Sequence, residues 1–129
     1  MLNEKVQQYQ IVGQHTEKVN RLLDIDLLTG DVCVYPGFRK HVKKKHKNCL
    51  EYIPKIQEII ANPDYVGVNP DEPNSVEYVK VFDKTVLLSV NLCTDKEEDY
   101  LYVSSLYDIS EGKLNNRLNS ERLKKIFDT

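Results

Sequence analysis

The residues of this chain best suited to proton transfer are two histidines in a strongly basic stretch. His41 and His46 lie five residues apart, and the stretch 39–47 around them carries six Lys and Arg side chains and no acidic one. An imidazole ionises near neutral pH, so it can take or give a proton under physiological conditions. Neighbouring cations can stabilise charge that develops on a phosphate. The pattern therefore predicts a site for a polyanion, although a solvated basic helix with two surface histidines fits the same charges equally well.

These side chains must be positioned by a helix that begins after Pro36-Gly37, a pair of residues that favours a turn. The helix carries an apolar stripe suited to packing on a sheet, made by Phe38, Val42 and Cys49. At about 100° per residue, Lys45 lies about 40° from His41, on the same side of the helix. His41 and His46 lie about 140° apart. We therefore expect the two imidazoles to diverge, with His46 farther from the apolar stripe and more available.

Composition and charge are those of an ordinary globular protein. The 129 residues are 40% hydrophobic and 29% charged with a net charge of −2, so we expect one domain over 1–129 and a local basic face rather than general affinity for polyanions. The three cysteines form no CxxC pair, and no apolar run approaches the roughly 18 residues of a membrane-spanning helix. We expect a soluble, cytoplasmic protein with free thiols.

Periodicity and chain breakers predict that helices come first and strands later. We expect helices at 15–23, 38–50, 52–61 and 110–127, and strands at 9–12, 32–35, 65–68, 76–82, 86–92 and 100–107. Short connections between the later strands favour an antiparallel meander. The predicted fold class is α+β, with helices packed on one face of a four- to five-stranded antiparallel sheet.

Alternation along the strands predicts one apolar sheet face and one open face. The residues expected to be buried between the apolar face and the helices are Phe38, Val42, Ile56, Ile59, Ile60, Leu88 and Val90. The open face is expected to display Tyr78, Lys80, Ser89, Asn91, Tyr102 and Ser104. Tyrosines and hydroxyls around a lysine suit a platform for single-stranded nucleic acid, whereas a solvated antiparallel sheet would show the same residue types. Ser104 and Ser105 point to opposite faces of an ideal strand, so both can join one site only if a β-bulge re-aims one of them.

Three stretches together resemble a known family. They are 34–41 with His46, the helix end 56–65 with the sequence IQEIIANPDY, and the strand 100–107 with the sequence YLYVSSLY. In this order they resemble the phage-associated branch of the barnase/EndoU/colicin/RelE-like (BECR) nuclease superfamily, over roughly residues 30–125. Residues 1–29 are less characteristic. The resemblance implies a BECR-like fold, an active site on the open sheet face, and RNA endonuclease activity of a toxin, phage or mobile element.

Metal-independent cleavage of RNA needs a base for the 2′-hydroxyl, an acid for the 5′-oxygen and cations around the phosphorus. The resemblance carries over His41, His46 and the serine pair, while Lys80 and Arg122 are added by position and chemistry. The predicted catalytic residues are therefore His46, His41, Lys80, Ser104, Ser105 and Arg122. The predicted RNA-binding residues are Arg39, Lys43, Lys44, Lys45, Lys47, Tyr102, Tyr107 and Arg117. We expect them to meet in a cleft between the histidine-bearing helix and the ends of strands 76–82 and 100–107.

The expected partner is RNA, with tRNA one candidate, and a cognate inhibitor protein is a further candidate. We expect no cofactor, no metal and no membrane contact; histidines at i and i+5 point too far apart on a helix to share one zinc ion. The alternative function is a catalytically silent RNA- or protein-binding module of a mobile element. A structural phage component whose basic helix binds an acidic partner is a third reading.

Overall fold

A seven-stranded sheet is the centre of the computed structural model, which describes residues 9–94 and 97–126. Its strands are β1 (Gln10–His15), β2 (Gly30–Val34), β3 (Tyr65–Gly67), β4 (Ser75–Val81), β5 (Thr85–Thr94), β6 (Asp99–Ile109) and β7 (Leu123–Lys125). The order across the sheet is β1-β2-β6-β5-β4-β3-β7. The pair β2 and β6 is parallel and the other neighbours are antiparallel. The class α+β is therefore correct, but four to five antiparallel strands was wrong, because β1 and β2 extend the meander on one side and β3 and β7 on the other.

The helices are shorter than predicted. They are α2 (Glu17–Leu23), α3 (Phe38–Lys45), the 3₁₀-helix η1 (Lys47–Lys55), α4 (Ile56–Ala61) and α5 (Glu111–Asn119). Pro54 lies inside η1, and the chain becomes α-helical only after it, which splits the predicted helix 52–61 in two. No helix in the part of the chain that the structure describes is long and apolar enough to cross a membrane.

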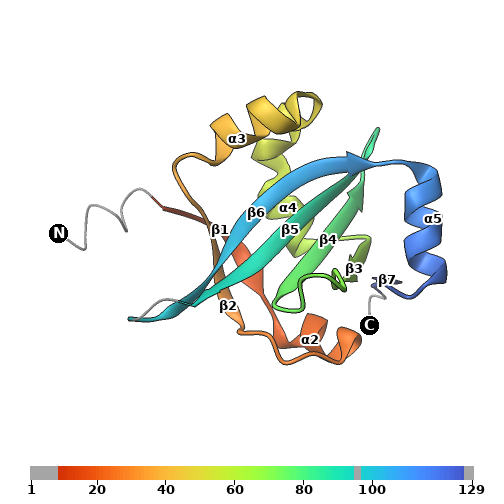
Figure 1. Ribbon diagram of the computed structural model, residues 1–129, viewed down its shortest axis with the longest axis horizontal. Coiled ribbons are helices and arrows are strands. Elements are labelled where there is room, and N and C mark those ends of the chain that lie inside the picture. Colours follow the sequence, from red (N-terminus) through yellow and green to blue (C-terminus); the bar gives the residue numbers. More distant parts are fainter. Residues whose placement is uncertain (1–8, 95–96, 127–129) are drawn as a thin grey trace.

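One face of the sheet is covered by α3, η1 and α4, and α4 lies behind the strands in Figure 1. The predicted core is confirmed: one buried cluster contains Phe38, Val42, Ile56, Ile59, Ile60, Leu88 and Val90. Tyr78 belongs to this cluster as well, although we expected it on the open face. The reason is register, because Tyr78 pairs directly with the buried Leu88 and shares its face.

The opposite face carries α5 at one end, which corrects the prediction of helices on one face only. A second buried cluster joins Leu114 of α5 to strand residues of that face, namely Val79, Leu87, Ile109 and Leu123. The predicted C-terminal helix ends at Asn119, and Leu123 to Lys125 form β7. Parts of our predictions for the two termini fall on 1–8 and 127–129, outside the described residues. The rest of this sheet face, beyond α5, is open.

Candidate active site

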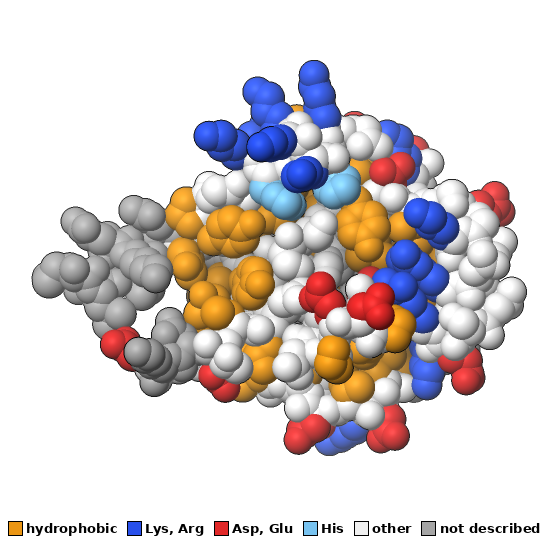
Figure 2. Space-filling model, in the orientation of Figure 1, with side chains coloured by type: hydrophobic (Ala, Val, Ile, Leu, Met, Phe, Trp, Pro, Cys, Tyr) orange, Lys and Arg blue, Asp and Glu red, His pale blue; other side chains and the backbone are white. Residues whose placement is uncertain are grey.

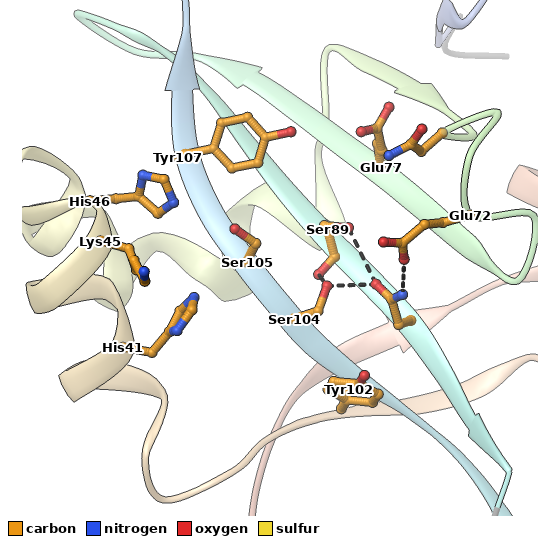
Figure 3. A pocket seen from close by; sticks show the side chains of 12 residues that line it. His41, Lys45, His46, Glu72, Glu77, Ser89, Tyr102, Ser104, Ser105 and Tyr107 are labelled. Carbon is orange, nitrogen blue, oxygen red and sulfur yellow. Dashed lines mark hydrogen bonds between the residues drawn. The ribbon is translucent and has the colours of Figure 1, made fainter.

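A cavity of about 510 Å³ lies on the open sheet face, beside the C-terminal end of α3 (Figure 3). Its lining combines imidazoles, one lysine, carboxylates, hydroxyls and amides from α3, β4, β5, β6 and the loop before β4. These residues are His41, Lys45, His46, Asn69, Glu72, Glu77, Ser89, Asn91, Tyr102, Ser104, Ser105 and Tyr107. In Figure 3, the basic side chains stand on one side of the cavity and the carboxylates on the other. The face thus presents ionisable groups on both sides of a polar floor.

Both histidines line this cavity, although helical geometry predicted that they would diverge. The reason is that α3 ends at Lys45, and His46 adopts a non-helical backbone with φ −140° and ψ 57°. The turn brings the His46 ring to Tyr107, with 5.4 Å between ring centroids. His41 and Lys45 lie one turn apart on α3 and face the same way, as predicted. The three basic groups therefore form one wall of the site.

The end of α3 is fixed against β6 by an aspartate. Asn48 of η1 donates a hydrogen bond of 2.9 Å to Asp108 Oδ1, and the Cys49 thiol donates to the same oxygen at 3.7 Å. The bond from Asn48 is the main reason that the pKa of Asp108 lies below its ordinary value. Burial raises the pKa of the Cys49 thiol to about 11, so this thiol is protonated and can act as a donor. These bonds hold the histidine-bearing turn over the sheet.

A β-bulge in β6 brings both serines to the same side. Ser105 pairs with Ser89, whereas the next pair is Val103 with Val90, so Ser104 is an extra residue in β6. Ser104 and Ser105 consequently both line the cavity. The bulge also reverses the faces that follow it: Leu106 is buried in the core, where simple alternation had placed it on the open face. Tyr107 then shares the open face with Ser105.

Hydrogen bonds order the floor of the cavity. Ser104 donates to Asn91 Oδ1 at 2.5 Å, and Asn91 Nδ2 donates to Glu72 Oε2 at 2.5 Å. The hydroxyl of Ser89 lies 3.4 Å from the same amide oxygen. Ser105 also lines the cavity, and Figure 3 draws no hydrogen bond between its hydroxyl and the other residues shown. The amide of Asn91 therefore links β5, β6 and the loop before β4.

Arg122 reaches the site through a buried carboxylate. Its Nε and Nη2 donate to the two carboxylate oxygens of Glu77 at 3.0 and 2.8 Å, and Glu77 is 1% exposed. The carboxylate holds the pKa of the guanidinium above its ordinary value. Arg122 belongs to the turn after α5, not to the last helix as predicted. That turn packs on Gly67, where a Cβ atom would lie 1.8 Å from the Arg122 carbonyl oxygen, so only glycine permits this approach.

Lys80 does not join the other predicted catalytic residues. It lines a second cavity, of about 720 Å³, with residues of α2 and α4, and its Nζ donates to Asn62 O at 2.7 Å. Lys80 pairs with Val86, whose side chain lies on the helix-covered face. The predicted placement of Lys80 was therefore wrong for the same reason as that of Tyr78: register, not alternation, decides which face is covered. Lys45 is the lysine of the first cavity.

The predicted RNA-binding residues divide between the cavity and its surroundings. Lys45, Tyr102 and Tyr107 line the cavity. The other four predicted cations of this stretch, Arg39, Lys43, Lys44 and Lys47, are exposed on or just after α3, and Figure 2 shows Lys and Arg side chains projecting above the histidines. Arg117 is partly buried on α5, and its Nη1 has no hydrogen-bond partner among the described residues. The catalytic and RNA-binding roles of all these residues stay predictions.

Comparison with known proteins identifies the family. A family model described as phage-Barnase-EndoU-ColicinE5/D-RelE like nuclease3 matches residues 10–116. The chain belongs to this nuclease family. No curated protein and no solved structure matches the chain. Membership of this nuclease family confirms the resemblance seen in the sequence, and it makes a nucleic acid the expected substrate of the chain.

Sequence reasoning missed the acidic wall of the site. Glu72 and Glu77 were not selected, because carboxylates repel phosphate and neither belongs to a recognisable motif. Neighbouring residues of a strand point to opposite faces, so Glu77 lies on the open face because Tyr78 lies on the covered one. Only the pairing register of β4 with β5 carries that information. Within 9–94 and 97–126, no group of three or more potential metal-ligating side chains is present.

Proposed function

We propose that this member of the nuclease family is a metal-independent endoribonuclease. The observation that carries the proposal is the meeting of two imidazoles and Lys45 with the serine pair and the Arg122–Glu77 pair around one cavity. Histidine is the side chain best suited to move protons at neutral pH. RNA carries its own nucleophile, the 2′-hydroxyl, so the protein has only to move two protons and stabilise charge.

The reaction would proceed by in-line transfer. One imidazole removes the proton of the 2′-hydroxyl, and the 2′-oxygen forms a bond to the adjacent phosphorus. The bond from phosphorus to the 5′-oxygen breaks, and this oxygen leaves with a proton from the other histidine, present as imidazolium. The products are a 2′,3′-cyclic phosphate and a free 5′-hydroxyl. His46 and His41 are the proposed acid and base, because both line the cavity from the α3 side.

The neighbouring polar groups would stabilise the negative charge that develops on the phosphate oxygens while the 2′-oxygen bonds to phosphorus. Lys45 supplies a positive charge from α3, and the hydroxyls of Ser104 and Ser105 supply hydrogen-bond donors from β6. Arg122 has two roles in this proposal. Its Nε and Nη2 neutralise Glu77, which would otherwise repel phosphate, and its Nη1 is not used in that pair. The exposed cations around α3 would attract the flanking phosphates.

The test of the reaction uses three oligonucleotides of one sequence incubated with the purified protein and a chelator. They are all-RNA, all-DNA, and RNA with a single deoxynucleotide at the mapped cleavage position. We expect cleavage of the RNA alone, with a 2′,3′-cyclic phosphate identified by mass spectrometry. Cleavage of DNA, or loss of all activity in the chelator, would contradict the proposed mechanism. A total tRNA preparation tests the predicted target class in parallel.

Variants test the assignment of the histidines. His41→Ala and His46→Ala are each expected to lower kcat by about 100-fold or more, the usual size of a general acid or base contribution, with an unchanged melting temperature. Lys40→Ala is the matched control, because Lys40 is exposed on the same helix and does not line the cavity. If the wild-type protein binds RNA in a salt-sensitive way but never cleaves it, the alternative of a silent binding module replaces the nuclease.

A further inference from the structure

We propose that a strip of tyrosines beside the cavity binds unpaired bases beyond the two nucleotides that flank the scissile phosphate, so that the substrate is single-stranded RNA. This inference rests on the proposed function and extends it to the substrate class. The strip consists of Tyr102, Tyr100 and Tyr35, with Tyr9 at its far end. Tyr102 also lines the cavity, so the strip and the candidate active site are continuous.

The geometry of the strip follows from the two strands that carry it. Tyr100 and Tyr102 are two residues apart on β6, before the bulge, and so share the open face with Ser104. Their ring centroids are 6.2 Å apart, and that of Tyr35, just after β2, is 6.3 Å from Tyr102. The parallel pairing of Cys33 with Tyr102 brings the end of β2 to this point of β6. Residues far apart in the chain thereby form one aromatic surface.

The rings are held in place but are not enclosed. All of them are partly exposed, and their planes are inclined to one another by 55° to 63°. Inclined rings contact each other through their edges and do not stack face to face. The rings therefore do not cover one another's faces, and a base can stack on them. Figure 2 shows hydrophobic side chains gathered on this face of the molecule, directly beside the histidine side chains. An aromatic surface of this kind is the usual platform for unstacked bases.

Charge distinguishes this surface from the other wall of the site. The exposed cations around α3 border the cavity from above, where they can meet a phosphate backbone, whereas the strip itself contributes only phenol rings. A strand that lies across both would place its phosphates toward α3 and its bases toward the tyrosines. Bases in a duplex are already stacked and paired, so a double helix cannot use the strip. The combination therefore favours a single strand over a duplex or an acidic protein.

The experiment measures binding and cleavage separately. Binding uses fluorescence anisotropy with an RNA oligonucleotide of about ten residues that carries a single deoxynucleotide at the cleavage position and is therefore uncleavable. We expect Tyr100→Leu and Tyr35→Leu each to weaken binding by about 10-fold, since removal of one aromatic platform has an effect of this order, with an unchanged salt slope because no charge is removed. Tyr100→Phe and Tyr35→Phe keep the ring and should bind as the wild type does.

Cleavage of a minimal dinucleotide supplies the second measurement. Because a dinucleotide fills only the cavity and is too short to reach Tyr100 and Tyr35, its kcat/KM should be the same for the wild type and both Leu variants, while cleavage of the longer RNA should show a raised KM. Equal affinity of the Leu variants and the wild type would overturn the inference, as would equally tight binding of the annealed duplex. A protein dimer in sedimentation that the Leu variants dissociate would assign the strip to self-association instead. If no RNA is cleaved, the proposed reaction fails, but the anisotropy comparison still decides the strip.

Discussion

The Arg122–Glu77 pair is a buried ion pair joined by two hydrogen bonds at the edge of the site. Glu77 is nearly inaccessible, and both of its oxygens accept from one guanidinium that is itself one-fifth exposed. A buried carboxylate without its partner keeps the full cost of its desolvation. The pair therefore contributes to stability as well as to the charge of the cavity, and a variant must separate the two contributions.

Removal of Arg122 alone should destabilise the protein substantially. We expect Arg122→Met to lower the free energy of unfolding by about 3 kcal/mol, the lower end of the range for a broken buried pair, because the guanidinium is partly hydrated. Adding Glu77→Gln should restore most of that stability without restoring cleavage, because the cation is still missing. Urea denaturation of both single variants and the double variant gives the coupling energy. Strictly additive effects would show that the pair contributes nothing of its own.

At the scale of elements, the site depends on two irregularities. The helix α3 ends one residue before His46, and β6 carries one extra residue at Ser104. A longer α3 would turn His46 away from His41, and a regular β6 would point Ser105 into the core. Each irregularity has a hydrogen bond beside it: Val42 O accepts from the His46 N–H at 2.7 Å, and the Ser104 hydroxyl donates to Asn91 Oδ1 at 2.5 Å.

The exposed face of α3 should control the salt dependence of RNA binding. Changing Lys43, Lys44 and Lys47 to Gln together should weaken binding, and the slope of log K against log salt should fall by about 0.7 for each single-strand phosphate that the variant no longer neutralises. The matched control changes Lys55, Lys113 and Lys125, which are equally exposed on other elements, so that net charge alters by the same amount. An identical slope in both triple variants would place the phosphate path away from α3.

At the scale of the whole molecule, a buried polar network joins the N-terminal part of the chain to the sheet. His15 is 1% exposed; its Nε2 lies 2.6 Å from Asn20 Oδ1 and its Nδ1 lies 2.5 Å from the Tyr78 hydroxyl. Asn20 Nδ2 donates to Leu27 O, which fixes the orientation of the amide. His15 Nε2 therefore carries the proton, and Nδ1 accepts from Tyr78. The network ties β1, α2 and β4 together.

This network makes stability depend on pH. Burial lowers the pKa of His15 in the folded state, so as pH falls below about 6.5 the unfolded chain binds a proton that the folded protein does not bind. The free energy of unfolding should then decrease with falling pH, by at most about 1.4 kcal/mol per pH unit. His15→Gln keeps a donor and an acceptor but cannot titrate here. Urea denaturation of both proteins between pH 5 and 7 should show a flatter profile for the variant, and parallel profiles would contradict the assignment.

The sequence by itself determined the family and the approximate positions of most helices and strands. The apolar stripe of α3, the alternation within β5 and the basic stretch 39–47 are local patterns, and each depends only on residues close together in the chain. The core residues Leu88 and Val90, the helix that bears His41, and the likeness to the nuclease family could therefore all be predicted before the structure.

The tertiary structure decided which side chains meet. Tyr78 and Lys80 lie on the covered face because of their register with β5, which alternation within β4 cannot reveal. His46 joins His41 because a helix ends where packing against Asp108 begins, and a bulge is visible only when β6 is paired with β5. Arg122 reaches the site through Glu77, 45 residues away in the chain. Such contacts depend on pairing over long sequence separations, and local periodicity carries no record of them.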